Sequence, residues 1–400
     1  MKRTIFHIDV NSAYLSWTSA ENLRTGTGPD LRKIPAIIGG DESSRHGIVL
    51  AKSIPAKAFG IRTGEPIASA RKKCPNLILA PPDHTLYSDY SRRLIQFLYS
   101  LTPDLEQVSI DECYLDFTPI AHRYSSPFAA AVSFKDEIFR KFGFTVNVGI
   151  SSNKLLAKMA SDFEKPDRVH TLFPEEIAKK MWPLPVEELF MAGRSSVDTL
   201  HKLGVRTIGE LAHTEPSLLE SHMKSHGRML WNYANGIDDA PVISTPPEAK
   251  GIGNSTTLSQ DAVTAEEARA VLLKLSESVS ARLRKAGMIA GNVCVEIKYN
   301  TFIRVSHQTS VDPPINTCEG IYQTSSRLFD ALWNHAPIRL LGIRASKLLP
   351  ADTPVQLSIF DLKTPENEKQ KKLDTALDAI RQRYGKDAVV RGSSLKPPRT

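Results

Sequence analysis

A stretch rich in proline and poor in apolar residues divides the chain, so each side of it must fold around a core of its own. Residues 238–250 include Pro241, Pro246 and Pro247, a composition typical of linkers between domains. Beyond it, the predicted order is β-α-β-β-α-β, with strands at 251–258, 293–299, 302–309 and 338–346 and helices at 265–285 and 321–332. This order predicts a split βαβ, ferredoxin-like domain.

The first 170 residues mix strand and helix patterns, and acidic residues lie at the ends of several predicted strands. An apolar run at 4–10 predicts a strand with Asp9 near its end. Extended runs at 105–110 and 113–117 are separated only by Asp111 and Glu112, which predicts a hairpin with both carboxylates at its tip. The other predicted elements are helices at 86–101 and 127–142, a strand at 144–150 and a helix capped by Ser152. Together they predict a small mixed sheet backed by helices.

Two further segments lack the mixture of strand and helix patterns seen in the first 170 residues. Residues 173–240 lack strand alternation and predict a compact helical module. The last fifty residues carry Pro, Lys and Glu with scattered apolar side chains, which predicts a mobile tail with one short helix.

Composition limits the setting and the partners. The 51 Lys plus Arg against 44 Asp plus Glu give a net charge of +7 and a pI of about 9.1, which suits an anionic partner without identifying one. Four cysteines lie far apart, without the spacing of a zinc site or a disulfide framework. We expect no signal peptide, because Asp9 and Asn11 interrupt the first apolar stretch too soon, and no apolar run approaches the ~18 residues of a membrane span. We therefore expect a cytoplasmic protein with no membrane contact.

The carboxylates of Asp9, Asp111 and Glu112 carry the strongest chemical signal. In a sheet with the first strand beside the hairpin, all three would converge. Hard oxygen ligands in that number suit Mg²⁺, and two such ions ~3.5 to 4 Å apart would support an in-line phosphoryl displacement. Any one of these residues alone would read as an ordinary strand end or polar turn. Their combined placement predicts nucleotidyl transfer.

Three motifs carry a resemblance to a known family. The segments IDVNSAY at 8–14, SIDECYLD at 109–116 and VGISSNK at 148–154 resemble the palm motifs of Y-family translesion DNA polymerases. Their order and spacing agree with that family, and the resemblance extends to about residue 350, with features of both the bacterial polymerase IV and polymerase V branches. It implies an α+β right-hand fold with a ferredoxin-like palm, small fingers, a helical thumb and a split βαβ little finger. The implied domains are palm 1–11 and 80–172, fingers 12–79, thumb 173–240 with a helix-hairpin-helix, linker 241–250, little finger 251–348 and tail 349–400.

The resemblance assigns a role to each palm residue. It implies that Asp9, Asp111, Glu112 and the backbone carbonyl of Val10 hold two Mg²⁺ ions. Tyr14 matches the steric-gate position, where an aromatic ring would clash with a ribose 2′-hydroxyl.

Nucleotide binding is where the chain departs from the family pattern. Lys165 matches the lysine that reaches the triphosphate. In the fingers, Ile54 and Lys57 stand where many members have the Tyr and Arg of a Tyr-x-x-Arg motif. Lys57 can supply charge but not a bidentate fork. Either Lys52 or Lys57 compensates, or nucleotide affinity is weaker, and we assign the contact to Lys57.

Residues outside the palm are implied to bind DNA and a sliding clamp. Thumb residues Gly193 and Gly204 match hairpin glycines that grip a phosphate, although Ser195 replaces a second glycine of the first hairpin. In the little finger, Arg339 and Arg344 match template contacts, and Lys298 and Arg304 would extend that basic face. The segment with Gln356, Leu357, Ile359 and Phe360 resembles the bacterial clamp-binding peptide.

The implied function is low-fidelity translesion synthesis without proofreading, on primer-template DNA with deoxynucleoside triphosphates, by a monomer. Two alternatives remain at this stage. One is a catalytically idle DNA-binding and clamp-recruiting scaffold, which the intact carboxylates disfavour. The other is a cyclase-like or primase-like nucleotidyl transferase, which the helical thumb, the clamp-like peptide and Tyr14 disfavour.

Overall fold

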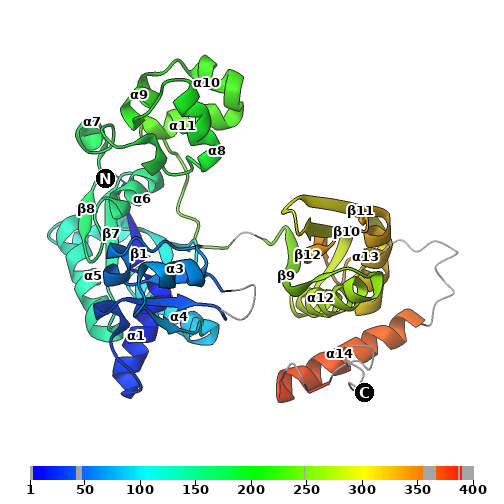
Figure 1. Ribbon diagram of the computed structural model, residues 1–400. Helices are drawn as coiled ribbons and strands as arrows, with labels where there is room; N and C mark the ends of the chain where they lie inside the picture. The colour runs from blue at the N-terminus through cyan, green and yellow to red at the C-terminus, as the bar shows by residue number, and fades with distance from the viewer. Residues whose placement is uncertain (1–2, 42–46, 247, 355–365, 386–387, 390–400) are drawn as a thin grey trace. The chain divides into compact units, whose positions relative to one another are not determined.

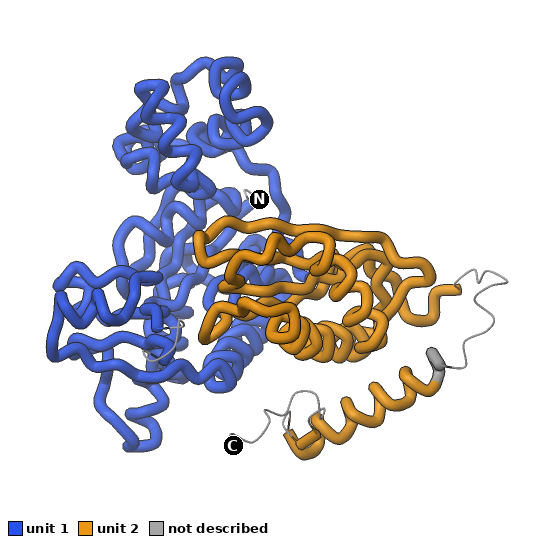
Figure 2. The backbone as a smooth tube through the Cα atoms, turned by 45° about the vertical axis from the view of Figure 1, so that its right-hand side comes forward, with its two compact units in different colours: residues 1–43, 47–246 blue, residues 44–46, 247–400 orange. Residues whose placement is uncertain are grey.

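The computed structural model describes residues 3–41, 47–246, 248–354, 366–385 and 388–389. The chain forms two compact units, one of residues 1–43 and 47–246 and one of the residues from 247 onward (Figure 2). None of the described helices is both long and apolar enough to cross a membrane.

A five-stranded sheet organises the first unit, in the order β5-β6-β1-β7-β8. Strands β1, β7 and β8 of this sheet are labelled in Figure 1. The strands are β1 (Ile5–Val10), β5 (Leu105–Gln107), β6 (Glu112–Asp116), β7 (Val146–Ser151) and β8 (Val169–Thr171). Strand β1 pairs antiparallel with both β6 and β7, and Asp9 stands opposite Glu112 on one side and Asn147 on the other. The first strand therefore lies beside the carboxylate hairpin, as the sequence predicts.

Strand alternation separates an apolar face from a polar one. Phe6, Ile8 and Val10 point into the main core, which α1 (Ala13–Thr25), α4 (His84–Tyr99) and α5 (Pro127–Phe142) complete. His7 and Asp9 point to the opposite face, where α6 (Lys154–Asp162) packs. The side chains that carry chemistry thus gather between the sheet and α6.

Helix α6 lies against β7 at backbone contact distance. A Cβ built at Gly149 would fall 2.0 Å from the carbonyl oxygen of Ala157 and 2.4 Å from the amide of Ser161, so only glycine fits there. The N-cap of α6 is Asn153, whose side chain accepts a hydrogen bond from the Leu156 amide, and the sequence prediction of Ser152 as the cap is wrong by one residue.

The fingers and thumb complete the first unit. A three-stranded sheet, β3-β2-β4, is formed by β2 (Ala36–Gly39), β3 (Val49–Lys52) and β4 (Ile78–Ala80), with α2 (Ile54–Ala58) and α3 (Ile67–Lys73). The thumb contains α7 (Ile177–Lys180), α8 (Arg194–Lys202), α9 (Ile208–His213), α10 (Pro216–Met223) and α11 (Ser225–Ala234) around an apolar core shared with α6.

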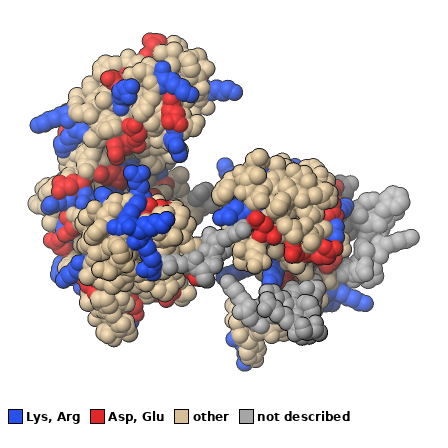
Figure 3. Space-filling model, viewed as in Figure 1, with Lys and Arg blue, Asp and Glu red and all other residues tan. Residues whose placement is uncertain are grey.

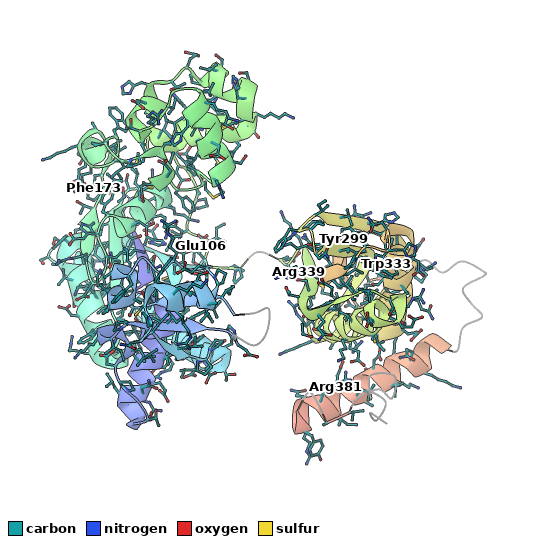
Figure 4. All side chains as sticks on the ribbon, viewed as in Figure 1. Glu106, Phe173, Tyr299, Trp333, Arg339 and Arg381 are labelled. Atoms are coloured by element: carbon teal, nitrogen blue, oxygen red, sulfur yellow. The ribbon has the colours of Figure 1, made fainter. Side chains whose placement is uncertain are left out.

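The chain after the thumb is held against the palm. Glu106 accepts hydrogen bonds from the Ile243 amide at 2.8 Å and from Lys154 Nζ at 2.7 Å (Figure 4). Lys154 Nζ also donates to the Pro241 carbonyl at 3.3 Å. The first residues of the predicted linker thus belong to the surface of the first unit.

The second unit is a four-stranded antiparallel sheet in the order β11-β10-β12-β9, covered on one face by two helices. Its elements are β9 (Gly251–Ala262), α12 (Ala265–Lys285), β10 (Met288–Tyr299), β11 (Arg304–Ile315), α13 (Cys318–Leu332) and β12 (Ile338–Pro350). Each helix connects two strands that have one other strand between them, which is the split βαβ arrangement.

The described part of the tail contains α14 (Glu366–Tyr384), a helix of 19 residues. Arg284 of α12 donates to Asp378 at 2.7 and 3.0 Å and to the buried Asp374 at 3.2 Å. Asp374 also accepts from the amide of Cys318, the first residue of α13, at 2.8 Å. Arg381 of α14 reaches Glu277 of α12 at 3.3 Å (Figure 4). The prediction of one short helix in a mobile tail is therefore wrong for these residues, because ion pairs hold a long helix against α12.

Candidate active site

The carboxylates lie where the end of β1 meets the start of β6. Asp9 pairs in register with Glu112, and the Val10 amide donates to the Asp111 carbonyl at 3.0 Å. Burial raises the pKa of Asp111, the negative charges of Asp9 and Glu112 raise it further, and a hydrogen bond from Ser109 at 2.6 Å opposes the shift. The structure thus brings together all three residues that the sequence predicts here.

One oxygen of Glu112 lies close to two nitrogens, and Lys158 donates a hydrogen bond to it. His7 Nε2 lies 3.3 Å from Glu112 Oε2, and Lys158 Nζ lies 2.9 Å from the same oxygen. The hydrogen bond from His7 and, behind it, that from Lys158 lower the pKa of Glu112 to about 2 against the opposing effect of burial. Burial lowers the pKa of His7, and its Nδ1 lies 2.8 Å from the hydroxyl of Ser161.

Two lysines share the carboxylates of the site. Lys165 Nζ lies 2.6 Å from Asp9 and 2.9 Å from Asp162, and Lys158 Nζ lies 3.6 and 3.4 Å from the same two residues. Burial lowers the pKa of each lysine, but Asp9 and Asp162 outweigh it and raise the pKa overall, helped at Lys158 by Glu112. Both side chains are therefore ammonium ions.

The donor set fits a divalent cation. In the described part of the chain, no group of three or more His, Cys, Asp or Glu side chains could hold a metal by itself, and Asp9 and Glu112 are paired with lysines instead. The four carboxylates of Asp9, Asp111, Glu112 and Asp162 nevertheless outnumber the two ammonium groups. Their oxygens are hard ligands. Burial raises the pKa of Asp111 most, and the charges of Asp9 and Glu112, which a bound cation would offset, raise it further.

A cavity of about 600 Å³ opens beside the carboxylates and extends to the fingers. Its lining combines Asp9 and Asp111 with side chains from the fingers and from the segment after α6, namely Tyr14, Lys52, Ile54, Lys57 and Lys165. Its size lies within the range of small-molecule sites, and its charges are acidic at the palm end and basic elsewhere.

Tyr14 stands in the first turn of α1 with its ring against the cavity wall. The turn before it places Ser12 in the left-handed region, with φ of 47°, and Ser16 closes it with a hydrogen bond to the Asn11 carbonyl at 2.5 Å. The Tyr14 ring stacks on the buried Tyr87 ring, with centroids 4.3 Å apart. The aromatic ring at the predicted gate position is thus fixed by α4.

The fingers contribute two lysines. Lys57 on α2 and Lys52 at the end of β3 both line the cavity, as does Ile54, whose residue is 58% exposed. Burial lowers the pKa of Lys52, and the nearby charge of Lys57 lowers it further. Lys52 therefore lines the cavity beside Lys57, the residue to which we assign the triphosphate contact in the fingers from the sequence.

Sequence reasoning missed two residues of the palm. His7 and Lys158 both contact Glu112, yet neither lies in the quoted stretches that point to metal binding. A local signal for His7 exists, because a polar residue within the apolar run of β1 shares the strand face of Asp9. Lys158 falls one helical turn from Lys154 and had no such signal.

The predicted thumb glycines lie at opposite ends of α8. Gly193 is its N-cap, and Gly204 follows its C-terminus with φ of 82°. A Cβ at either position would meet no described atom within 4 Å, so both backbones face open space. Ser195 lies in the first turn of α8 and forms no cap bond there.

The four predicted basic residues of the second unit differ in their pairing. Arg304 lies 3.0 Å from Glu296, so its charge is partly neutralised. Lys298 and Arg339 lie 4.3 and 4.9 Å from the ring centre of Phe302, a residue that is 60% exposed. Arg344 is exposed between the buried Ile343 and Ala345, so it points away from the helices.

In Figure 3, positive and negative side chains are interspersed over the viewed face of the first unit. The predicted clamp-binding residues Gln356, Leu357, Ile359 and Phe360 lie outside the described residues.

Comparison with known proteins identifies relatives along the whole chain. Residues 8–162 match the impB/mucB/samB family, and residues 249–359 match the impB/mucB/samB family C-terminal domain. The chain is 45% identical to a DNA polymerase IV of Clostridium acetobutylicum, with 99% of each chain covered. It is 35% identical to a DNA polymerase IV 1 of Bacillus subtilis, with 98% of this chain and 94% of that protein covered. A solved Y-family DNA polymerase chimera shares the fold, with a TM-score of 0.74, 20% identity and 86% of this chain and 99% of that one covered.

Proposed function

This chain belongs to the impB/mucB/samB family of Y-family DNA polymerases, and we propose that it copies damaged templates by adding deoxynucleotides to a primer 3′-end. It is a DNA-directed DNA polymerase, and its reaction is nucleotidyl transfer to the primer 3′-hydroxyl. The observation that carries the proposal is one cavity lined by Asp9 and Asp111 at one end and by Lys52 and Lys57 at the other. An anionic triphosphate fits the basic end while its reacting phosphate faces the carboxylates.

The palm residues suit a two-metal reaction. Asp9, Asp111, Glu112 and the Val10 carbonyl would hold two Mg²⁺ ions, which neutralise charge on the phosphate and activate the primer hydroxyl. The chain itself fixes the carboxylates, since His7 and Lys158 hold one oxygen of Glu112 and leave the other free. Catalysis then depends mainly on position and electrostatics.

Nucleotide binding falls to three lysines and one ring. Lys165, Lys52 and Lys57 line the cavity as cations for the triphosphate. The Tyr14 ring, stacked on Tyr87, occupies the place where it would clash with a ribose 2′-hydroxyl. The Ile54 side chain offers no hydrogen bond, so the lysines carry the triphosphate contact in the fingers.

We assign primer-template binding to backbone contacts without sequence readout. Gly193 and Gly204 leave open approach to the thumb backbone. Lys298, Arg339 and Arg344 supply charge in the little finger, and Arg304 supplies less because Glu296 pairs with it.

The remaining properties follow from family membership. We propose low fidelity without proofreading, because no segment of the sequence offers the extra carboxylate cluster of a proofreading exonuclease. The peptide with Gln356, Leu357, Ile359 and Phe360 would recruit a sliding clamp and so raise the local concentration of the enzyme at primer ends. We further propose that the protein acts as a cytoplasmic monomer.

Primer extension tests the proposal most directly. A primed template with Mg²⁺ and deoxynucleotides is incubated with the wild-type chain or with Asp111→Ala, and the products are resolved on a gel. Addition of a few nucleotides by the wild type alone supports the polymerase and its carboxylate site together. No addition by either protein favours a DNA-binding scaffold, and addition by both removes Asp111 from the site.

A further inference from the structure

A single buried amide, Asn147 on β7, uses its whole hydrogen-bonding capacity beneath the active site. Its Nδ2 donates to the carbonyls of Ser161 at 3.0 Å and Glu164 at 2.7 Å. Its Oδ1 accepts from Asn11 Nδ2 at 3.0 Å and from the Arg168 amide at 3.2 Å. The residue is 0% exposed, so each of these bonds replaces one that water cannot supply.

Two of the four bonds fix the segment that carries Lys165. The Glu164 carbonyl and the Arg168 amide lie on either side of Lys165 in the chain, and both are tied to the same side chain. A third tie comes from Asp167, whose amide donates to Asn11 Oδ1 at 2.9 Å. The backbone around Lys165 is therefore positioned by Asn147 and Asn11 rather than by regular secondary structure.

The other end of the network fixes the turn that carries Tyr14. Asn11 Oδ1 also accepts from the Thr145 hydroxyl at 2.9 Å, and the Asn11 amide donates to the Thr145 carbonyl at 3.1 Å. The Asn11 carbonyl accepts a hydrogen bond from the Ser16 hydroxyl. Ser16 lies in the first turns of α1, the helix that carries Tyr14. The side-chain amides of Asn11 and Asn147 thus connect the start of α1 with the Lys165 segment, although Lys165 follows Asn11 by 154 positions in the sequence.

We propose that Asn147, acting through Asn11, is a positioning residue that sets the distance between Lys165 and Tyr14. The triphosphate contact and the sugar gate would then hold the nucleotide from both ends, so that a loosened network weakens nucleotide binding and sugar discrimination together. This inference rests on the proposed nucleotide roles of Lys165 and Tyr14. It extends them to a residue that does not line the cavity.

The chain offers a matched control on the same strand. Ser151 also lies on β7 with 0% exposure, points to the same face as Asn147, and donates one buried hydrogen bond to the Leu172 carbonyl. Among the described residues, Ser151 forms no side-chain hydrogen bond with the Lys165 segment or with Asn11. Ser151→Ala therefore reproduces the loss of a buried hydrogen bond from β7 without touching the network.

The experiment measures nucleotide binding apart from catalysis. The full chain is bound to primer-template with a 3′-dideoxy primer, and the Kd of dATP and of ATP is measured by fluorescence for the wild type and for Asn147→Asp, Asn147→Ser, Lys165→Ala and Ser151→Ala. Asn147→Asp keeps the shape and the accepting Oδ1 but replaces Nδ2, which donates both hydrogen bonds. We expect it to raise the Kd of dATP about tenfold and to reduce the ATP-to-dATP Kd ratio. Asn147→Ser provides the milder variant if Asn147→Asp does not fold. The Kd for DNA should stay unchanged in both.

The outcomes separate this inference from the function on which it rests. If Lys165→Ala leaves the Kd of dATP unchanged, the proposed role of Lys165 fails. If Lys165→Ala weakens binding while folded Asn147 variants bind both nucleotides like the wild type, the positioning role of Asn147 is overturned. A loss in Ser151→Ala equal to that in the Asn147 variants also overturns it, because the effect would then be general to β7.

Discussion

The Tyr14 and Tyr87 rings are stacked face to face, with centroids 4.3 Å apart and planes 8° from parallel. Tyr87 is fully buried, and its hydroxyl forms a hydrogen bond with the Thr18 hydroxyl at 3.2 Å, so the Tyr87 ring cannot turn away. The Tyr14 ring is thereby held at the cavity wall. A steric gate has to be rigid if it is to exclude a single hydroxyl group.

Truncation of Tyr14 should admit ribonucleotides. Tyr14→Ala removes the ring, and we expect the preference for dATP over ATP in single-turnover insertion to fall at least ~10-fold, or about 1.4 kcal/mol of discrimination. Tyr14→Phe keeps the stack and should behave as the wild type. An unchanged preference in Tyr14→Ala would place the gate elsewhere in the cavity.

Neutralising Asp111 should stabilise the protein while it removes activity. Folding raises the pKa of Asp111, so the ionised group opposes folding at neutral pH, and this cost disappears as pH falls through the raised pKa. Asp111→Asn should therefore raise Tm by about 2–4 °C at neutral pH without metal, with a smaller gain in acid. Calorimetry beside primer extension measures both effects. A lower Tm in Asp111→Asn at neutral pH would contradict the electrostatic argument.

Nucleotide affinity should have an alkaline limb that Lys52 controls. Because burial and the Lys57 charge lower the pKa of Lys52, this lysine loses its proton at a lower pH than an ordinary lysine. As pH rises through that lowered pKa, the KM for dATP should increase. Lys52→Arg keeps its charge and should hold KM flat over the same range, whereas Lys57→Ala should move the limb to higher pH. KM profiles that coincide for the wild type and Lys52→Arg would exclude Lys52.

The little-finger arginines should differ in their salt dependence. Arg344 has no carboxylate partner among the described residues, so Arg344→Ala should weaken DNA binding and reduce the slope of log K against log salt by about 0.9. Arg304→Ala should change the slope less, because Glu296 lies 3.0 Å away. Glu296→Gln should free Arg304 and tighten binding at low salt. Filter binding over a salt series measures all three, and equal slopes for Arg304→Ala and Arg344→Ala would contradict this ranking.

The tail helix should detach when one buried carboxylate is removed. Asp374 is 2% exposed and accepts from both Arg284 and the Cys318 amide. Asp374→Ala breaks this buried pair, and we expect docking of α14 to lose on the order of 3 kcal/mol. Hydrogen exchange of α14 should become fast in Asp374→Ala, while exchange in β10 and β12 stays slow. Protection of α14 equal to the wild type would show that other contacts hold it.

Local patterns in the sequence predicted the elements that bury an apolar stripe. The helices at 127–142 and 265–285 begin and end where the spacing of their apolar residues predicts. Strand β11 runs to Ile315 rather than 309, because most of its side chains are exposed and leave no alternation to read. Helix α14 was underestimated for a related reason, since its partners lie about ninety residues away in sequence.

The site itself was predictable at its centre and not around it. Asp9, Asp111 and Glu112 could be predicted because strand ends and a tight hairpin leave few places for their side chains. Lys158 required the structure, because a lysine on a helix is interpreted as a solvated charge until its carboxylate partner is seen. Arg304 shows the opposite error, because its pairing with Glu296 depends on strand register that composition does not reveal.

The glycine contact between β7 and α6 bears on how this enzyme could be redesigned. Since no side chain separates Gly149 from Ala157, α6 cannot shift on the sheet, and the carboxylates with Lys158 form a rigid unit that tolerates little change. The fingers side of the cavity, with Ile54 exposed and Lys52 and Lys57 on short elements, has no comparable constraint. Engineering for unnatural nucleotides should therefore begin in the fingers, where a library of substitutions can change which substrates are accepted while the carboxylates of the palm keep their positions.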